Sequence, residues 1–86
     1  MIIGVAVKHG DVCICLPKPS RHHHCMRYAV DVLGLKPPIG ANADFQGFYL
    51  KNGKFLNRKS ALEYAKEHKQ LVNKEATGYL FSEDLW

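Results

Sequence analysis

The sequence predicts a small α+β domain, in which an antiparallel sheet of two hairpins carries two helices on one face. Three observations predict it: paired β-branched runs around Gly10, an Asn52-Gly53 turn between apolar runs, and a helix-forming stretch after each hairpin. Asn-Gly between apolar runs is the strongest short-range sign of a hairpin. The expected order is ββαββα, with residues 78–81 as the candidate for a further strand, all within one domain over residues 1–86.

The N-terminal half is expected to form a hairpin followed by a helix. Residues 2–7 and 12–16 are short apolar runs of strand type. Ser20 is the expected N-cap of a helix over residues 21–33, because a serine side chain accepts from the free N–H groups of a first turn. Gly34 suits the left-handed residue that ends such a helix.

The C-terminal half repeats this order after a loop over residues 35–44. Residues 45–50 and 54–56 flank the Asn-Gly turn as the strands of a second hairpin. Asn57 is the expected cap of a second helix over residues 58–68, whose interior is rich in strong helix formers.

Helical periodicity places basic and imidazole side chains on faces that should be buried. At about 100° per residue, the first helix has one apolar face with His22 at its centre, His23 at its border and His24 toward water. The apolar members of this face are Cys25, Met26, Ala29, Val32 and Leu33. In the second helix, Arg58 lies on the face formed by Ala61, Leu62 and Ala65.

Both helix starts therefore carry the charge that a helix N-terminus disfavours. A first turn has unpaired N–H groups and a partial positive charge, so it prefers acidic residues. Here Arg21, His22 and His23 begin one helix, and Arg58 and Lys59 begin the other. Two such ends with inward-facing basic groups predict an anion pocket. Near these ends His22 or His23 is expected to be neutral, and each is a candidate general base or acid.

The last residues are expected to complete this pocket. Glu83 and Asp84 can bind sugar hydroxyls or a base, and Trp86 can close the pocket or stack on the ligand. A purely structural role fits the same residues. Arg58 would then pair with Glu83 or Asp84 and hold the C-terminus, and His22 would bond to a backbone carbonyl in the core. Four further aromatic residues could stack on a base, but in a small sheet such residues more often form the core, and we interpret them so: Phe45, Phe48, Tyr79 and Phe81.

A zinc site is considered and set aside. Cys13 and Cys15 with His22 and Cys25 have the residue types of a four-ligand site. Residues two apart in a strand are about 6.6 Å apart, which is too far for two ligands of one zinc ion unless the strand bends. We therefore expect buried free thiols, no metal and no cofactor. The odd cysteine number, three, also favours a reducing cytosol over a disulfide framework.

Charge and hydropathy limit the partners. The formal net charge of +4 favours anionic partners. Nucleic acid is a weaker candidate, because the basic residues are mostly scattered lysines. No apolar run approaches the roughly 20 residues that cross a bilayer, so no membrane association is expected. A chain this small can also form a homodimer that shares the pocket.

Three segments together resemble a family of short bacteriophage and prophage proteins. They are LPKPSRHHH at residues 16–24, QGFYL with GKFLNRKSA at residues 46–50 and 53–61, and LFSEDLW at residues 80–86. The resemblance implies a phage accessory protein in the host bacterial cytoplasm and no particular reaction. Small phage proteins of this kind often counter host defence, which suggests sequestration of a nucleotide signal.

The resulting hypothesis is a phage accessory protein that binds a small anionic, nucleotide-like ligand at the two helix N-termini, sequestering a host immune signal. The expected binding residues are Arg21, His22, His23, Arg58, Glu83, Asp84 and Trp86. One alternative is a small His-dependent hydrolase or phosphotransferase acting on a nucleotide or an ADP-ribose-like substrate. Another is an interaction protein that blocks a host protein or binds nucleic acid.

Overall fold

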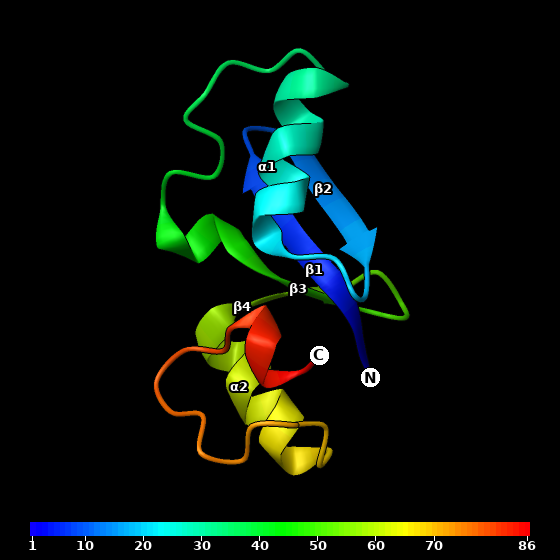
Figure 1. Ribbon diagram of the computed structural model, residues 1–86, viewed down its shortest axis with the longest axis vertical. Coiled ribbons are helices and arrows are strands. Elements are labelled where there is room, and N and C mark those ends of the chain that lie inside the picture. The colour runs from blue at the N-terminus through cyan, green and yellow to red at the C-terminus, as the bar shows by residue number, and fades with distance from the viewer.

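The computed structural model describes all residues 1–86 and confirms the α+β class and the order ββαββα (Figure 1). There are also two short 3-10 helices: η1 directly precedes the third strand, and η2 lies near the C-terminus. The elements are β1 Ile2–His9, β2 Val12–Pro17, α1 His22–Asp31, η1 Ala43–Phe45, β3 Gln46–Leu50, β4 Phe55–Asn57, α2 Arg58–Glu67 and η2 Ser82–Asp84.

The four strands form one antiparallel sheet in the order β2-β1-β3-β4. Gly10 turns the first hairpin with a φ of +60°. Gly53 turns the second with a φ of +87°, and the Asn52 side chain accepts from the Lys54 N–H. Both hairpins predicted from the sequence are therefore confirmed, because glycine supplies the left-handed backbone conformation that each turn needs.

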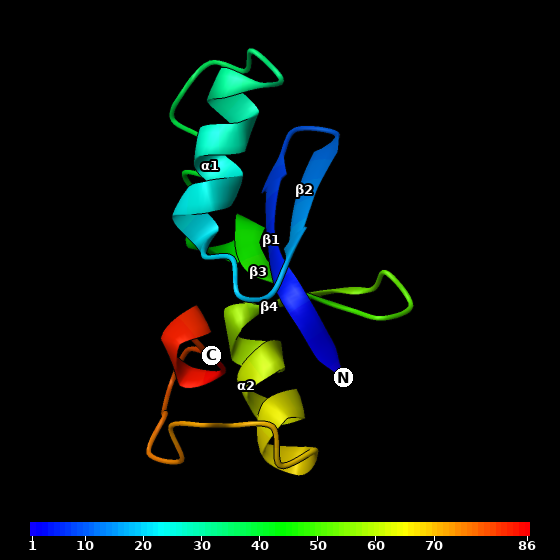
Figure 2. The same cartoon turned by 45° about the vertical axis from the view of Figure 1, so that its right-hand side comes forward.

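Both helices cover the same face of the sheet, which we call the inner face (Figure 2). They begin near the middle of the molecule and run in opposite directions, so that their N-terminal ends face each other (Figure 1). Val5, Val7 and Phe48 point from the sheet into the core and are fully buried. Alternation along the strands places a second set on the opposite, open face, among them Lys8, Cys13, Cys15, Tyr49 and Phe55.

The first helix starts and ends differently from the prediction. Ser20 does not cap it; Arg21 is the N-cap residue, and its N–H donates to Nδ1 of His24 at 2.8 Å. His24 is expected only to be solvated, but its imidazole closes the start of the helix by accepting from the N–H of the N-cap residue, whereas a capping serine would accept from an N–H of the first turn. The helix ends at Asp31, so Val32 and Leu33 do not reach the core and are 62% and 44% exposed.

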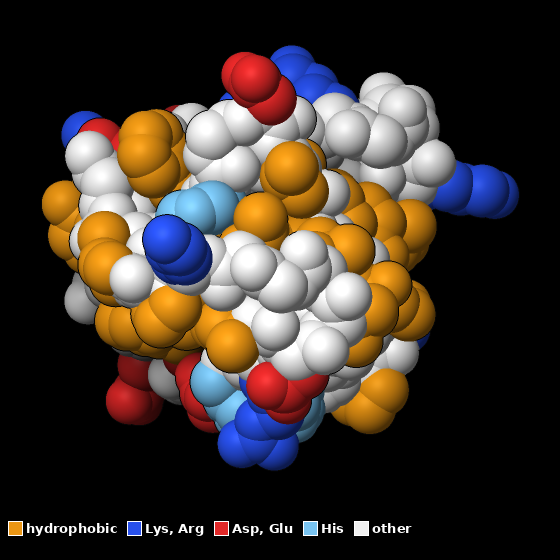
Figure 3. Space-filling view, turned by 90° about the horizontal axis from the view of Figure 1, so that it is seen from above, with side chains coloured by type: hydrophobic (Ala, Val, Ile, Leu, Met, Phe, Trp, Pro, Cys, Tyr) orange, Lys and Arg blue, Asp and Glu red, His pale blue; other side chains and the backbone are white.

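Val32 and Leu33 thereby leave hydrophobic side chains exposed at the C-terminal end of α1. Figure 3 views the molecule from the end of α1 and shows hydrophobic side chains over this surface, with charged groups mainly toward the rim. The helix stops early because the chain reverses at Gly34, which has a φ of +67°, and the N–H of Leu35 donates to the Ala29 carbonyl. The prediction of Gly34 as the reversing residue is confirmed, but the helix is shorter than expected.

The second helix agrees closely with the prediction. Asn57 caps it by accepting from the Ser60 N–H at 2.8 Å. Its buried residues are Ala61, Leu62 and Ala65. After it, the Gln70 side chain donates to the carbonyl of Ile2 and accepts from its N–H. The Gln70 amide thereby makes the two backbone hydrogen bonds with Ile2 that a neighbouring strand would otherwise make.

Residues 78–81 do not form a strand. Gly78 has a φ of +77°, and the N–H of Leu80 donates to the Arg58 carbonyl without continuing a ladder. Tyr79 and Phe81 are consequently 59% and 49% exposed. The prediction of core aromatics is right for Phe48 but wrong for Tyr79, Phe81 and Phe45, because only a paired strand would have carried them over the sheet.

Candidate functional site

The two helix starts meet, as their inward-facing residues predicted. Nη2 of Arg58, the first residue of α2, lies 3.4 Å from Nδ1 of His22, the first residue of α1. Nε2 of His22 lies 2.7 Å from the carbonyl oxygen of Gly47 in β3. A carbonyl only accepts and a guanidinium only donates, so Nε2–H donates to Gly47 and Nδ1 accepts from Arg58. His22 thus links the two helices to the sheet.

His22 is held neutral by this environment. Its pKa is lowered from 6.5 to about 4, mainly by burial and also by the positive charge of Arg58, whereas the Gly47 carbonyl and the charge of Glu83 partly oppose this shift. Its ring packs edge-on against Phe48, with the ring centroids 5.0 Å apart. Both ring nitrogens are engaged, so His22 positions the Arg58 guanidinium and has no free nitrogen for a ligand.

Arg58 carries the unsatisfied hydrogen-bonding group of the site. Its Nε is buried and has no hydrogen-bond partner. Burial lowers the pKa of the guanidinium, and the charge of Glu83 opposes this effect. An arginine stays protonated in proteins, so a positive charge with a free N–H donor remains. The ring of Phe81 lies 5.1 Å from Cζ and covers one side of the group.

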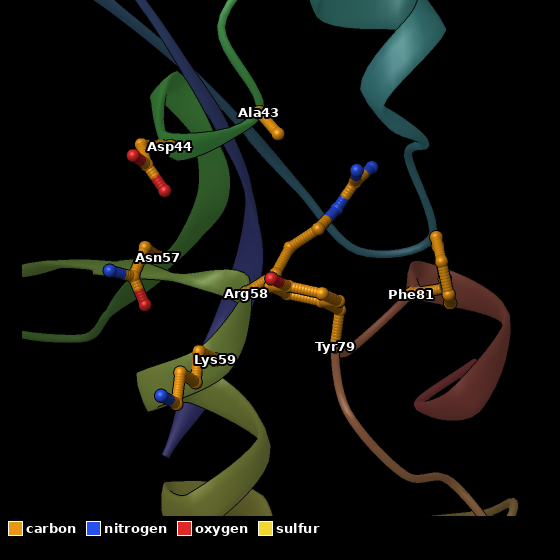
Figure 4. A pocket seen from close by; sticks show the side chains of 7 residues that line it. All are labelled: Ala43, Asp44, Asn57, Arg58, Lys59, Tyr79 and Phe81. Carbon is orange, nitrogen blue, oxygen red and sulfur yellow. The ribbon is translucent and has the colours of Figure 1, made fainter.

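A cavity of about 210 Å³ opens beside this guanidinium. The start of α2, η1 and the segment before η2 supply its lining, which consists of Ala43, Asp44, Asn57, Arg58, Lys59, Tyr79 and Phe81. Figure 4 shows the Arg58 side chain extending from the start of α2 across the site, with Phe81 at one side and Asp44 and Asn57 at the other. The cavity therefore combines two basic groups, one carboxylate, one amide and two aromatic rings.

The other predicted binding residues do not line this cavity. Arg21 is half-buried, and its Nη1 is buried without a hydrogen-bond partner. His23 is exposed, with its ring 4.1 Å from the ring of His24. Glu83 is exposed and close enough to influence the charges of both His22 and Arg58.

Asp84 and Trp86 make structural contacts. The buried carboxylate of Asp84 accepts from the Phe81 N–H and from the Asn73 side chain, each at 2.9 Å. The indole N–H of Trp86 donates to the Ser20 carbonyl, and its ring packs edge-on against Phe48. These contacts hold residues 81–86 against the start of α1 and so fix the position of Phe81 at the cavity.

Sequence reasoning missed most of the lining. The sequence predicts Tyr79 and Phe81 as core residues and Asp44 as part of a loop, so none of the three is predicted to line the cavity. Gly78 was the available signal against a strand, because a glycine there permits the left-handed conformation that turns the chain away from the sheet. The position of Asp44 beside the second helix depends on the path of residues 35–42, which contain no periodic pattern.

The four residues considered for zinc do not come together. Cys25 is buried on the inner face, and its Sγ lies 3.9 Å from the Val5 carbonyl, whereas Cys13 and Cys15 are exposed on the open face. No group of three or more His, Cys, Asp or Glu side chains is arranged to hold a metal ion.

Comparison with known proteins gives one family match. The family model described as Phage T4 y16D protein matches residues 1–86. No curated protein and no solved structure is significantly similar to the chain. None of the helices has the length and apolar character that a bilayer crossing requires.

Proposed function

Since this chain belongs to the Phage T4 y16D protein family, we propose that it is a phage accessory protein that binds a small phosphate-bearing, nucleotide-like ligand in the Arg58 cavity. The observation that supports this proposal most directly is the buried Nε of Arg58 without a partner, beside an open cavity. A buried donor without an acceptor costs about 1–3 kcal/mol, and a phosphate bound by this guanidinium would remove that cost once the side chain uncovers Nε.

Charge favours an anion in this place. Arg58 and Lys59 lie at the first turn of α2, where the helix dipole adds to their positive charge. One carboxylate, Asp44, lines the same cavity and leaves a net positive site. We assign the phosphate to the Arg58 and Lys59 side, and a hydroxyl-bearing group such as ribose to the Asp44 and Asn57 side.

Size and aromatic content limit the ligand. Sites for drug-sized molecules usually enclose about 300–1,000 Å³, so a cavity of about 210 Å³ suits a single phosphate with its sugar. The exposed rings of Tyr79 and Phe81 lie at its rim and offer surfaces on which a base can stack. The ligand class that fits is therefore a mononucleotide or a nucleotide-derived signal of similar size.

The geometry favours binding over catalysis by His22. A general base needs a free nitrogen and a pKa near the working pH, but both ring nitrogens of His22 are engaged and its pKa is lowered to about 4. His23, the other candidate catalytic residue, does not line the cavity. We therefore propose sequestration of the ligand, in the host bacterial cytoplasm, as the protein's contribution to phage infection.

The experiment is a binding screen by thermal shift and calorimetry with nucleoside monophosphates, cyclic nucleotides, inorganic phosphate and nucleosides. A ligand at 100 times its Kd should stabilise the protein by about 2.7 kcal/mol. Arg58→Met and Lys59→Met should each weaken binding at least tenfold, and the exposed Lys66→Met on the far part of α2 is the matched control. Nucleosides without phosphate should bind much more weakly.

Three outcomes would contradict the proposal. Equal affinity for nucleosides and nucleotides would show that the phosphate group contributes nothing to binding. Unchanged affinity in both Arg58→Met and Lys59→Met would show that the ligand binds at another place on the protein. Because Lys59 is exposed, its substitution should leave the fold intact and so remains informative even if Arg58→Met alters the fold. Chemical conversion of a bound nucleotide would support the alternative of an enzyme, and salt-sensitive DNA binding alone would support a nucleic-acid partner.

A further inference from the structure

The open face of the sheet carries two thiols that nearly touch. Cys13 and Cys15 lie two residues apart in β2 and point to the same side, with their Sγ atoms 3.7 Å apart. Both are free and exposed, whereas Cys25 is buried behind the sheet. The backbone spacing of a strand had suggested that these sulfurs were too far apart for one metal ion, but the side chains converge and close that distance.

We propose that Cys13 and Cys15 chelate one thiophilic divalent cation of the zinc type. In tetrahedral coordination each sulfur lies about 2.3 Å from the metal, which places two ligand sulfurs about 3.8 Å apart. The observed separation of 3.7 Å matches this requirement. The pair can therefore bind a cation with rotamers already close to those of the complex, and without bending the strand.

The position of the pair leaves the rest of the coordination sphere open. β2 is an edge strand, with β1 as its single neighbour, and neither helix covers this face. Two protein ligands leave two positions of a tetrahedron for water or for a small thiol or carboxylate from solution. Such a site is exchangeable, in contrast to a closed structural site with four protein ligands.

Binding of a divalent cation by the pair displaces the thiol protons, as at any thiolate site. Lys8 pairs with Cys13 in the register and Tyr49 lies near Cys15, so both side chains border the pair on the same face.

The test is a titration of the reduced protein with Cd²⁺ alone, followed by the thiolate-to-cadmium charge-transfer absorption in the ultraviolet. The absorption should saturate at one Cd²⁺ per chain, and Cd²⁺ should displace Zn²⁺ from protein loaded with zinc beforehand. Cys13→Ser and Cys15→Ser should each abolish this saturable binding. Cys25→Ala is the matched control and should leave it unchanged, as should Arg58→Met, which lies on the other side of the sheet.

Several results would overturn the proposal. Absence of charge-transfer absorption at pH 8 with titratable free thiols would do so. So would retained stoichiometric binding in either single serine variant, or independent binding of one Cd²⁺ by each thiol. Failure of the wild-type protein to bind any nucleotide, with cadmium binding intact, would contradict only the function proposed above.

Discussion

The neutral state of His22 makes the stability of this protein depend on pH in a calculable way. An unfolded chain takes up a proton at a histidine near pH 6.5, whereas the folded protein holds that proton off until about pH 4. The stabilisation is therefore complete above pH 6.5 and is lost as the pH falls from 6.5 to 4. At about 1.4 kcal/mol for each tenfold change, the total is about 3 kcal/mol.

Most of this loss falls in a range where the carboxylates are still largely ionised. From the same two values, acidification from pH 7 to pH 5 should cost about 2 kcal/mol through His22 alone. For a domain of this size the corresponding fall in melting temperature is about 8–16 °C. Protonation would also place two positive groups together, since Nδ1 of His22 is 3.4 Å from Nη2 of Arg58.

The assay is urea denaturation at pH 7 and pH 5 for the wild type, His22→Gln and the matched control His23→Gln. His22→Gln should lose about 2 kcal/mol less than the wild type over this interval, whatever its absolute stability. His23→Gln should behave as the wild type, because His23 is exposed. Equal pH dependence in wild type and His22→Gln would refute the reasoning, as would an imidazole NMR titration of His22 with a midpoint above pH 6.

Three further substitutions test the packing of the fold, each by urea denaturation. Asn57→Ala should destabilise the protein by about 1 kcal/mol through loss of the α2 cap, and Asn57→Asp should retain most of the stability. Gln70→Leu should cost about 1–3 kcal/mol, because the backbone N–H and carbonyl of Ile2 lose their partners, and an equal stability would contradict that role. Gly47→Ala should cost about 1–3 kcal/mol or more, because a Cβ would meet the carbonyl oxygen of Leu56 in the adjacent strand.

Much of the fold was predictable because its signals are local. The turn glycines, the Asn57 cap and the alternation of β-branched residues each act over a few positions of chain. Ser20 failed as a cap because the helix begins one residue later than expected, with Arg21 as its N-cap and the His24 imidazole accepting from the Arg21 N–H. The segment 78–81 failed as a strand because Gly78 turns the chain and the Leu80 N–H bonds to the Arg58 carbonyl at the start of α2, and local pattern carries no information about that distant partner.

The site was predictable only in its centre. Helical periodicity was enough to bring His22 and Arg58 together, because each points inward from the start of a helix on the same face. The alternative that His22 bonds to a backbone carbonyl in the core is confirmed, but periodicity could not identify that carbonyl, since Gly47 belongs to a distant strand. Nor could it place Tyr79, whose position depends on how an irregular segment crosses the surface.

The cavity is assembled from three stretches of chain that are well separated in sequence. Residues 43–44, 57–59 and 79–81 each contribute a wall, and only the middle stretch belongs to a regular helix or strand. Leu80 in the third stretch and Leu85 just after it are buried in the core, so docking of residues 79–86 both completes the core and closes the cavity. Local opening of this segment should therefore expose Arg58 and abolish ligand binding before the sheet itself unfolds.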